Sequence, residues 1–164
     1  MNKYLKELIL GAIITSIIIV FQMLAMPQYI TGIIINLIYV VFTLVSGLRT
    51  TCYVAVLVPF IASITGILKP VLVPVIPIII LSNLIYVFSV YRIKGNNIFL
   101  RILFPPVLKA LTIFLGGKLF INFFEVHPMF QKMFIVFVSI NLMTAFVGNI
   151  IGIFLSKRLI RSRT

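Results

Sequence analysis

Acidic, histidine and cysteine side chains are scarce in this 164-residue chain, and this scarcity restricts its chemistry. The chain has two acids, Glu7 and Glu125, one histidine, His127, and one cysteine, Cys52. General acid–base catalysis needs positioned titratable groups, and a metal site needs a cluster of ligands. Neither pattern is present, nor is a glycine-rich phosphate loop or a nucleophile motif. The sequence therefore predicts no enzyme, no metal site and no cofactor.

Two lysines, Lys109 and Lys118, interrupt the apolar stretch of residues 99–120. A charged side chain in a membrane segment is costly, and it usually pairs with an opposite charge or marks a substrate path. Because the chain holds only two carboxylates, an ordinary buried ion pair is nearly excluded for Lys109. The position of these lysines is therefore the main functional question that the sequence raises.

The composition is that of a membrane protein. Apolar residues make up 62% of the chain, charged residues 10%, and the mean hydropathy is +1.27. A soluble domain averages roughly half apolar and about a quarter charged residues. The net charge of +12 does not indicate nucleic-acid binding, because the basic residues are spread over the predicted membrane edges.

The expected fold is an all-α membrane protein, a single domain over 1–164 with six transmembrane helices in one compact bundle. A spanning helix needs ~17–25 residues, and turn and charge signals divide the chain into six such runs. The first run exceeds the apolar core of a signal peptide, so we expect a retained span. The predicted spans are about 7–25, 29–47, 51–67, 74–91, 99–124 and 130–156.

Lysine and arginine are distributed unequally between the two sides of this arrangement. Two of them, Lys69 and Lys132, fall on one side. Positive residues favour the cytoplasmic side, so both termini are predicted to be cytoplasmic, in a multi-pass protein of the plasma membrane. The ten on the other side are Lys3, Lys6, Arg49, Arg92, Lys94, Arg101, Lys157, Arg158, Arg161 and Arg163.

Small residues and prolines mark two further segments. Gly11, Ala12, Thr15 and Ser16 form small-residue ridges on the first span, which permit close helix approach, either to a partner subunit or within the bundle. Four prolines lie between residues 59 and 77. Irregular backbone at membrane depth is tolerated where it is buried or lines a cavity. We therefore expect residues 65–77 to fold over a pocket on the outer side.

Two stretches resemble a known family. One is Pro27-Gln28-Tyr29-Ile30-Thr31-Gly32 followed by Asn36, and the other runs from Pro59 through Ser63, Gly66, Pro70, Pro74 and Pro77 to Asn83. With the six spans and cytoplasmic termini, they resemble the substrate-binding S component of energy-coupling factor (ECF) transporters. The resemblance covers nearly the whole chain and implies capture of a water-soluble vitamin or related micronutrient.

The same resemblance implies partners: a transmembrane coupling subunit and two ATPase subunits. The family's docking motif on the first span is typically Ala-xxx-Ala, whereas this chain has Ala12-xxx-Ser16. The nickel and cobalt members carry a histidine after the first methionine, and this chain has Asn2, which disfavours a metal substrate.

By resemblance, the pocket lies in the outer half of the bundle. The polar residues expected at that depth are Asn83, Asn141 and Thr144, with Asn36, Lys109, Lys118 and Asn122 as further candidates. An amide both donates and accepts hydrogen bonds, which suits the edge of a heterocycle.

The two lysines compete for this pocket. If span five begins at Pro105 or Pro106, Lys109 lies one turn inside the helix and reaches back to the headgroups. If the helix begins near residue 99 and bends at the prolines, Lys109 lies deeper and faces the ligand. Lys118 follows nine residues later and points about opposite at ~100° per residue, so the two lysines do not easily serve one ligand. Because Lys118 lies in the outer half, it is the better pocket candidate of the two. A contact between Lys118 and Glu125 is the structural alternative.

A different functional class is also compatible with six short spans: a scaffold of bacterial envelope assembly, similar to the rod-shape-determining MreD family. That family typically carries Gly-Asp positions in its spans, and this chain has no aspartate. A channel would need more polar lining than these residues supply.

Overall fold

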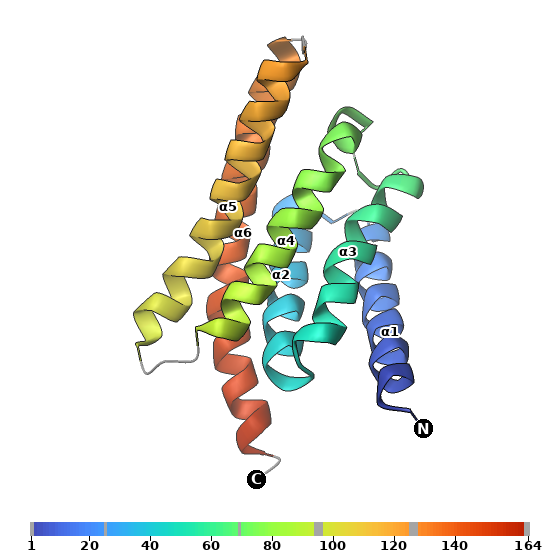
Figure 1. The fold of residues 1–164 in the computed structure, drawn as a ribbon, viewed down its shortest axis with the longest axis vertical. Coiled ribbons are helices and arrows are strands. Elements are labelled where there is room, and N and C mark those ends of the chain that lie inside the picture. Colours follow the sequence, from blue (N-terminus) through green and yellow to red (C-terminus); the bar gives the residue numbers. More distant parts are fainter. Residues whose placement is uncertain (1, 25, 69, 94–96, 125–127, 163–164) are drawn as a thin grey trace.

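The computed structural model describes residues 2–24, 26–68, 70–93, 97–124 and 128–162, and over these ranges the chain is helical without a strand. The helices follow one another as an up-and-down bundle, with both termini at its lower end in Figure 1. Their bounds are α1 Lys3–Met23, α2 Gln28–Val45, α3 Leu48–Ile64, the short 3-10 helix η1 Pro70–Val75, α4 Ile76–Arg92, α5 Ile98–Phe123 and α6 Pro128–Arg161.

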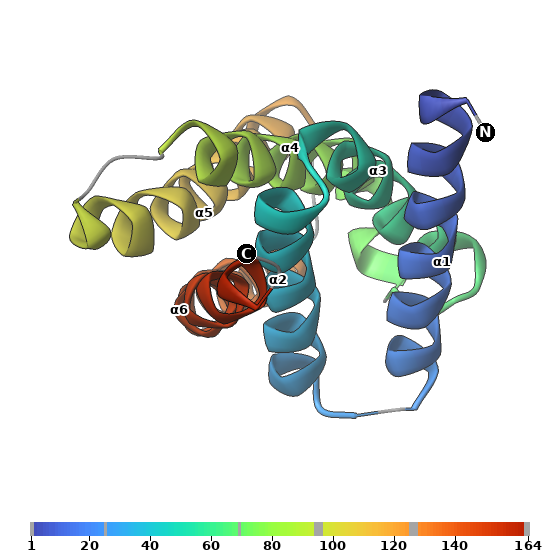
Figure 2. The same cartoon turned by 90° about the horizontal axis from the view of Figure 1, so that it is seen from below.

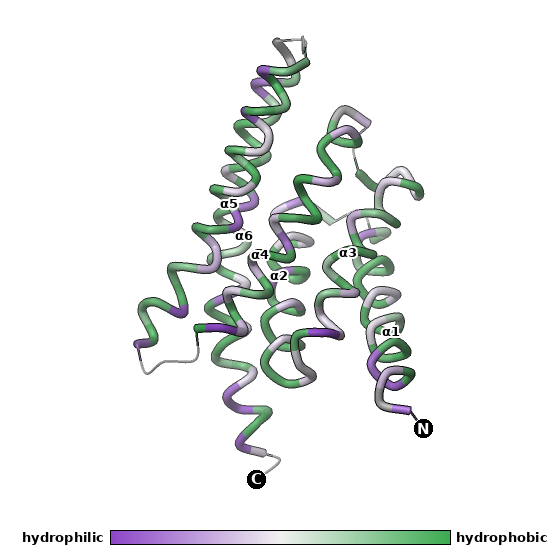
Figure 3. Tube along the Cα trace, in the orientation of Figure 1, coloured by the Kyte–Doolittle hydropathy of each residue, from purple (hydrophilic) through white to green (hydrophobic). Residues whose placement is uncertain are grey.

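Within the described ranges, five segments are long and apolar enough to cross a membrane, which makes the chain a multi-pass helical protein by length and composition. The sixth helix, α3, is apolar but has 17 residues, or about 26 Å at 1.5 Å per residue. Figure 3 shows apolar residues along most of each helix, with hydrophilic positions at the lower ends and at intervals in the middle and upper parts of the bundle. The five segments are Tyr4–Met23, Gln28–Val45, Leu72–Arg92, Ile98–Phe123 and Phe130–Arg161.

Glycines and a side-chain cap shift several helix ends from the predicted ones. α3 starts at Leu48, three residues earlier than expected, because Gly47 turns the chain at φ 103°. Gly66, at φ 72°, follows the end of α3. At the start of α1, the Asn2 side chain accepts a hydrogen bond from the Tyr4 backbone N–H at 3.3 Å, so the helix begins at Lys3.

Glycines let α2 and α6 pack backbone to backbone. A Cβ at Gly148 would lie 2.8 Å from the Ile33 carbonyl oxygen, and one at Gly152 would lie 2.7 Å from the Val40 Cβ. On α2, a Cβ at Gly32 would lie 3.0 Å from the Thr144 side chain. Gly148 and Gly152 form a GxxxG motif, which brings membrane helices close together. Figure 2 shows α2 and α6 side by side, with α3, α4 and α5 forming a row beside them.

α5 continues as a helix through Pro105 and Pro106. Each proline lacks an N–H, so the carbonyls of Arg101 and Ile102 lose their helical donors. Asn149 of α6 replaces both donors, because its Nδ2 lies 2.8 Å from the Arg101 oxygen and 2.9 Å from the Ile102 oxygen. The part of α5 before the prolines leans away from α6 in Figure 1, as expected for a helix bent at proline. The structure thus shows the helix that begins near residue 99, and not the start at Pro105.

Two apolar clusters form the core. One lies among α1, α2, α3, α4 and α6 and includes Tyr39 and Val58. The other joins η1, α4, α5 and α6 and includes Leu72 and Phe137. The space between the two clusters holds the candidate site.

Candidate functional site

A cavity of about 590 Å³ lies between the two apolar clusters, in the half of the bundle away from both termini. This volume is within the range of ~300–1,000 Å³ that is typical of small-molecule sites. The cavity reaches the surface near the α1–α2 connection, since the exposed Met23 and Met26 line it. Its polar lining residues are Gln22, Gln28, Thr31, Asn36, Tyr39, Asn83, Lys109, Asn141 and Thr144.

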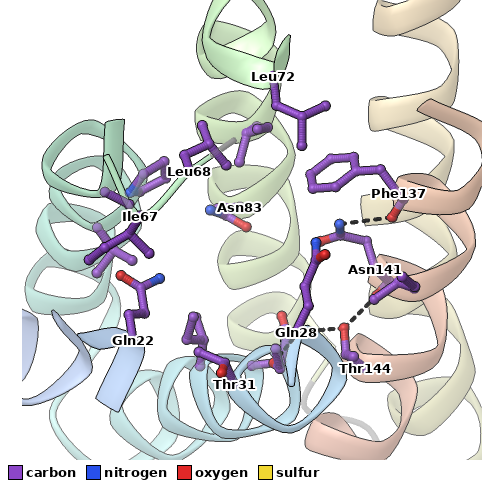
Figure 4. A pocket seen from close by; sticks show the side chains of 18 of the residues that line it. Gln22, Gln28, Thr31, Ile67, Leu68, Leu72, Asn83, Phe137, Asn141 and Thr144 are labelled. Carbon is purple, nitrogen blue, oxygen red and sulfur yellow. Dashed lines mark hydrogen bonds between the residues drawn. The ribbon is translucent and has the colours of Figure 1, made fainter. Parts of the chain in front are cut away.

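The predicted pocket-covering segment does contribute to this cavity. Ile67 and Leu68, after α3, and Leu72 of η1 line one side of it, together with Ile79 of α4 and Phe137 of α6. Figure 4 shows Gln22, Asn83 and Asn141 around the same space, on three different helices. The cavity therefore combines an apolar wall with separate amide groups, as small-molecule sites usually do.

A chain of hydrogen bonds connects three helices at the cavity wall. Lys109 Nζ donates to Asn36 Oδ1 at 2.7 Å. Asn36 Nδ2 donates to the Gly32 carbonyl at 2.8 Å and to Thr144 Oγ1 at 3.4 Å. Thr144 Oγ1 donates to the Asn141 carbonyl at 3.2 Å. These contacts orient Asn36 so that its oxygen faces the lysine.

Lys109 is buried in this wall, with 3% of its surface exposed. Its Nζ lies 5.2 Å from the centre of the Tyr86 ring and 5.8 Å from that of Tyr39, close enough for cation–π attraction. Of the two sequence-based alternatives for Lys109, the structure therefore shows the deep one that faces the cavity. The reason is the early start of α5, which places Lys109 three turns inside the helix.

Several polar groups at the cavity have no hydrogen-bond partner among the described residues. They are the Tyr39 hydroxyl and Gln22 Oε1, both buried. The Asn83 side chain is 5% exposed and likewise makes no hydrogen bond within the described part of the chain. Buried polar groups are nearly always paired, so such a cluster marks a place where a ligand or water supplies the partners.

Four of the predicted site residues come together here: Asn36, Asn83, Asn141 and Thr144. Lys118 and Asn122 do not line the cavity and are exposed on α5. Lys109 lines the cavity and the preferred Lys118 does not, because the face of α5 that carries Lys109 turns toward the interior of the bundle. Glu125 lies outside the described residues, as does His127.

Gly116 and Gly117 do not break α5. A Cβ at Gly116 would lie 2.7 Å from Ile78, and one at Gly117 would overlap the Phe134 ring. These glycines instead let α5 approach α4 and α6.

The predicted docking ridge of α1 is divided between two faces. Gly11 and Thr15 are buried, and a Cβ at Gly11 would meet Thr50 and Tyr53 of α3 at 3.6 Å. Ala12 and Ser16 are exposed on the outer face of α1. Gly11 and Thr15 therefore serve packing within the bundle, and only Ala12 and Ser16 are accessible to a partner.

Sequence reasoning missed some contributors. Tyr39, Gln22 and Gln28 also line the cavity. The only sequence signal for them was a polar side chain within or beside an apolar segment. Asn149, with its two hydrogen bonds to α5, was also missed. The GxxxG spacing of Gly148 and Gly152 is a sequence signal for close packing of α6 against another helix, which the sequence analysis did not use.

The lining offers amides, hydroxyls and one amine, which can bind a polar ligand by hydrogen bonds and one positive charge. In the described part of the chain, no three His, Cys, Asp or Glu residues lie close enough to hold a metal ion. Comparisons with protein-family models, with curated proteins and with solved structures found no match.

Proposed function

We propose that this chain is the substrate-capture subunit of an ECF-type importer, which binds a water-soluble vitamin or related micronutrient. The observation that carries this proposal is the cavity of about 590 Å³ inside an apolar bundle, whose lining combines hydrogen-bonded polar side chains with some that have no partner among the described residues. An ordinary packed core leaves no such volume.

We further propose that the protein lies in the plasma membrane. It crosses the membrane six times, with both termini in the cytoplasm. Supporting it, both termini and most basic residues lie at one end of the bundle, and the cavity lies toward the other end. By the positive-inside rule, the basic end is cytoplasmic, so the cavity faces outward. A short α3 is compatible with spanning, because a bilayer thins locally around a short helix.

The energy for transport would come from other chains, a coupling transmembrane subunit and two ATPase subunits. The sequence has no phosphate-binding loop of its own. Ala12 and Ser16 offer a small-residue surface on the exposed face of α1, where a partner helix can approach closely. The family resemblance supplies the identity of these partners.

The partner proposal is tested by purifying the tagged protein from native membranes in mild detergent and identifying what co-purifies by mass spectrometry. We expect a multi-span subunit with two ATPases, and we expect Ala12→Trp to lose them. Leu111→Trp, at an exposed position of α5, is the matched control and should retain them. Recovery of cell-wall synthesis proteins instead would contradict the importer and favour the envelope scaffold.

The binding site is tested separately with Asn83→Ala and Asn141→Ala. Each should weaken ligand binding by about 1–3 kcal/mol, because each removes an amide that faces the cavity. Asn122→Ala is the control, since Asn122 is an exposed amide outside the lining. Unchanged affinity in both cavity variants would contradict the assignment of this site.

A further inference from the structure

The wall of the cavity holds a basic side chain with no acidic side chain near it in the described part of the chain. Among the described residues that line the cavity, Lys109 is the one basic residue, and none carries a carboxylate. Among the described residues the only acid is Glu7, near the start of α1, at the end of the bundle opposite the cavity. A buried charge without a counter-charge is costly, and intramembrane charges that face a cavity usually serve a ligand.

The contacts of Lys109 leave room for an acceptor. An ammonium group carries three donors, and Asn36 Oδ1 takes one of them. Nζ makes no other hydrogen bond with the described residues, and the ring centres of Tyr39 and Tyr86 lie 5.8 and 5.2 Å from it. Tyr39 also lines the cavity, and its buried hydroxyl has no hydrogen-bond partner among the described residues.

On this basis, and resting on the proposed capture function, we propose that the substrate is a monocarboxylate whose carboxylate group binds Lys109. The carboxylate would supply the missing counter-charge and accept from the free donors. A phosphate monoester carries about −1.5 to −2 charges, more than one lysine balances. The lining also has no arginine, the residue that binds phosphate in a bidentate manner.

The other residues that line the cavity indicate the chemistry of the rest of the substrate. Leu68, Leu72 and Phe137 form an apolar wall, so the body of the substrate has an apolar face. The amides of Asn83 and Asn141 can donate to and accept from neutral polar groups on that body. The substrate class is thus a small amphipathic acid with one carboxylate and neutral polar groups.

The test compares carboxylates with their uncharged primary amides on the purified full-length protein. The probes are benzoate and benzamide, 3-phenylpropanoate and 3-phenylpropanamide, and indole-3-butyrate and its amide. Binding is measured as a rise in unfolding temperature. Unfolding is detected by the reaction of a thiol-specific dye with Cys52, the chain's one cysteine. Phenyl phosphate and phosphatidylglycerol are added as separate arms.

We expect the carboxylates to stabilise the wild-type protein and their amides to do so little. Lys109→Gln should weaken carboxylate binding about 10- to 100-fold, the effect of losing a hydrogen bond from a charged group. Lys109→Met is a second uncharged variant, which keeps the apolar stem. Lys118→Gln, which removes an exposed lysine of the same helix, should bind like the wild type.

Several results would overturn the inference. Equal stabilisation by acids and amides, or carboxylate binding that survives in both Lys109 variants, would show that the charge is not used, while capture by the cavity would stand. A stronger response to phenyl phosphate or to phosphatidylglycerol would replace the carboxylate with a phosphate or a lipid. No response to any carboxylate would also reject the inference. The capture function itself would fail only if, in addition, the purified protein carries no bound small molecule in native mass spectrometry.

Discussion

Replacing Asn149 with leucine should destabilise the bundle through α5, although Asn149 belongs to α6. Asn149 donates to the two carbonyls, of Arg101 and Ile102, that Pro105 and Pro106 leave without helical donors. Leucine has a similar size but no donor, so both carbonyls would remain unpaired in an apolar environment.

The magnitude follows from the two hydrogen bonds. Side-chain hydrogen bonds within membrane proteins contribute about 0.6–1.7 kcal/mol each, so the loss of both should cost about 1–3 kcal/mol. For a protein of this size, 1 kcal/mol corresponds to roughly 2–4 °C in unfolding temperature. Asn149→Leu should therefore unfold about 2–12 °C below the wild-type protein.

A double-mutant cycle isolates the cause. In a Pro105→Ala/Pro106→Ala background, the helix regains its own N–H donors to the same carbonyls. There, Asn149→Leu should cost less than about 0.5 kcal/mol, because each carbonyl already has a partner. An equal cost in both backgrounds, measured by thermal unfolding in the same detergent, would refute this explanation and assign Asn149 to packing alone.

Two other properties of the bundle are open to direct measurement. Gly148→Ala should lower the free energy of unfolding by about 1–3 kcal/mol, because the new Cβ would lie 2.8 Å from a backbone carbonyl of α2. Gly11→Ala is the control and should change little, because its Cβ would lie 3.6 Å from the nearest atoms. Equal thermal unfolding of both variants would contradict the close α2–α6 contact. The side of the membrane that each end of the bundle faces is tested with Thr65→Cys and Ser162→Cys, each in a Cys52→Ser background. Thr65→Cys should react with a membrane-impermeant maleimide in intact cells, and Ser162→Cys should react only after lysis. The reverse pattern would place the cavity on the cytoplasmic side.

The helical character of the chain could be predicted from hydropathy, because long apolar runs between turn residues admit few other structures. The ends of the helices were less accessible. α6 extends to Arg161, beyond the predicted end at residue 156, since apolar content does not determine where a helix continues past the membrane. The residues that gather at the cavity were partly predictable, because polar side chains in apolar spans usually face the interior.

The position of Lys109 could not be derived from the neighbouring sequence. It depends on whether α5 continues through Pro105 and Pro106, and local propensity favours a helix that begins at proline. The hydrogen bonds from Asn149, more than forty residues later in the chain, satisfy the carbonyls and keep α5 helical. A tertiary contact thus decides which lysine enters the cavity.

The division of the α1 ridge has a similar origin. Gly11, Ala12, Thr15 and Ser16 are equally small, so composition does not reveal which pair faces the bundle. The orientation of α1 on α3 buries Gly11 and Thr15 and leaves the other two outside.

The most direct test of the central claim, that the cavity captures a small molecule, is native mass spectrometry of the protein purified from cells grown in rich medium. The capture function predicts a 1:1 adduct with a small organic molecule, lost in Ala62→Phe, which places a ring in the cavity that Ala62 lines. A spectrum showing only the bare chain and phospholipid adducts, or an adduct that Ala62→Phe retains, would contradict it.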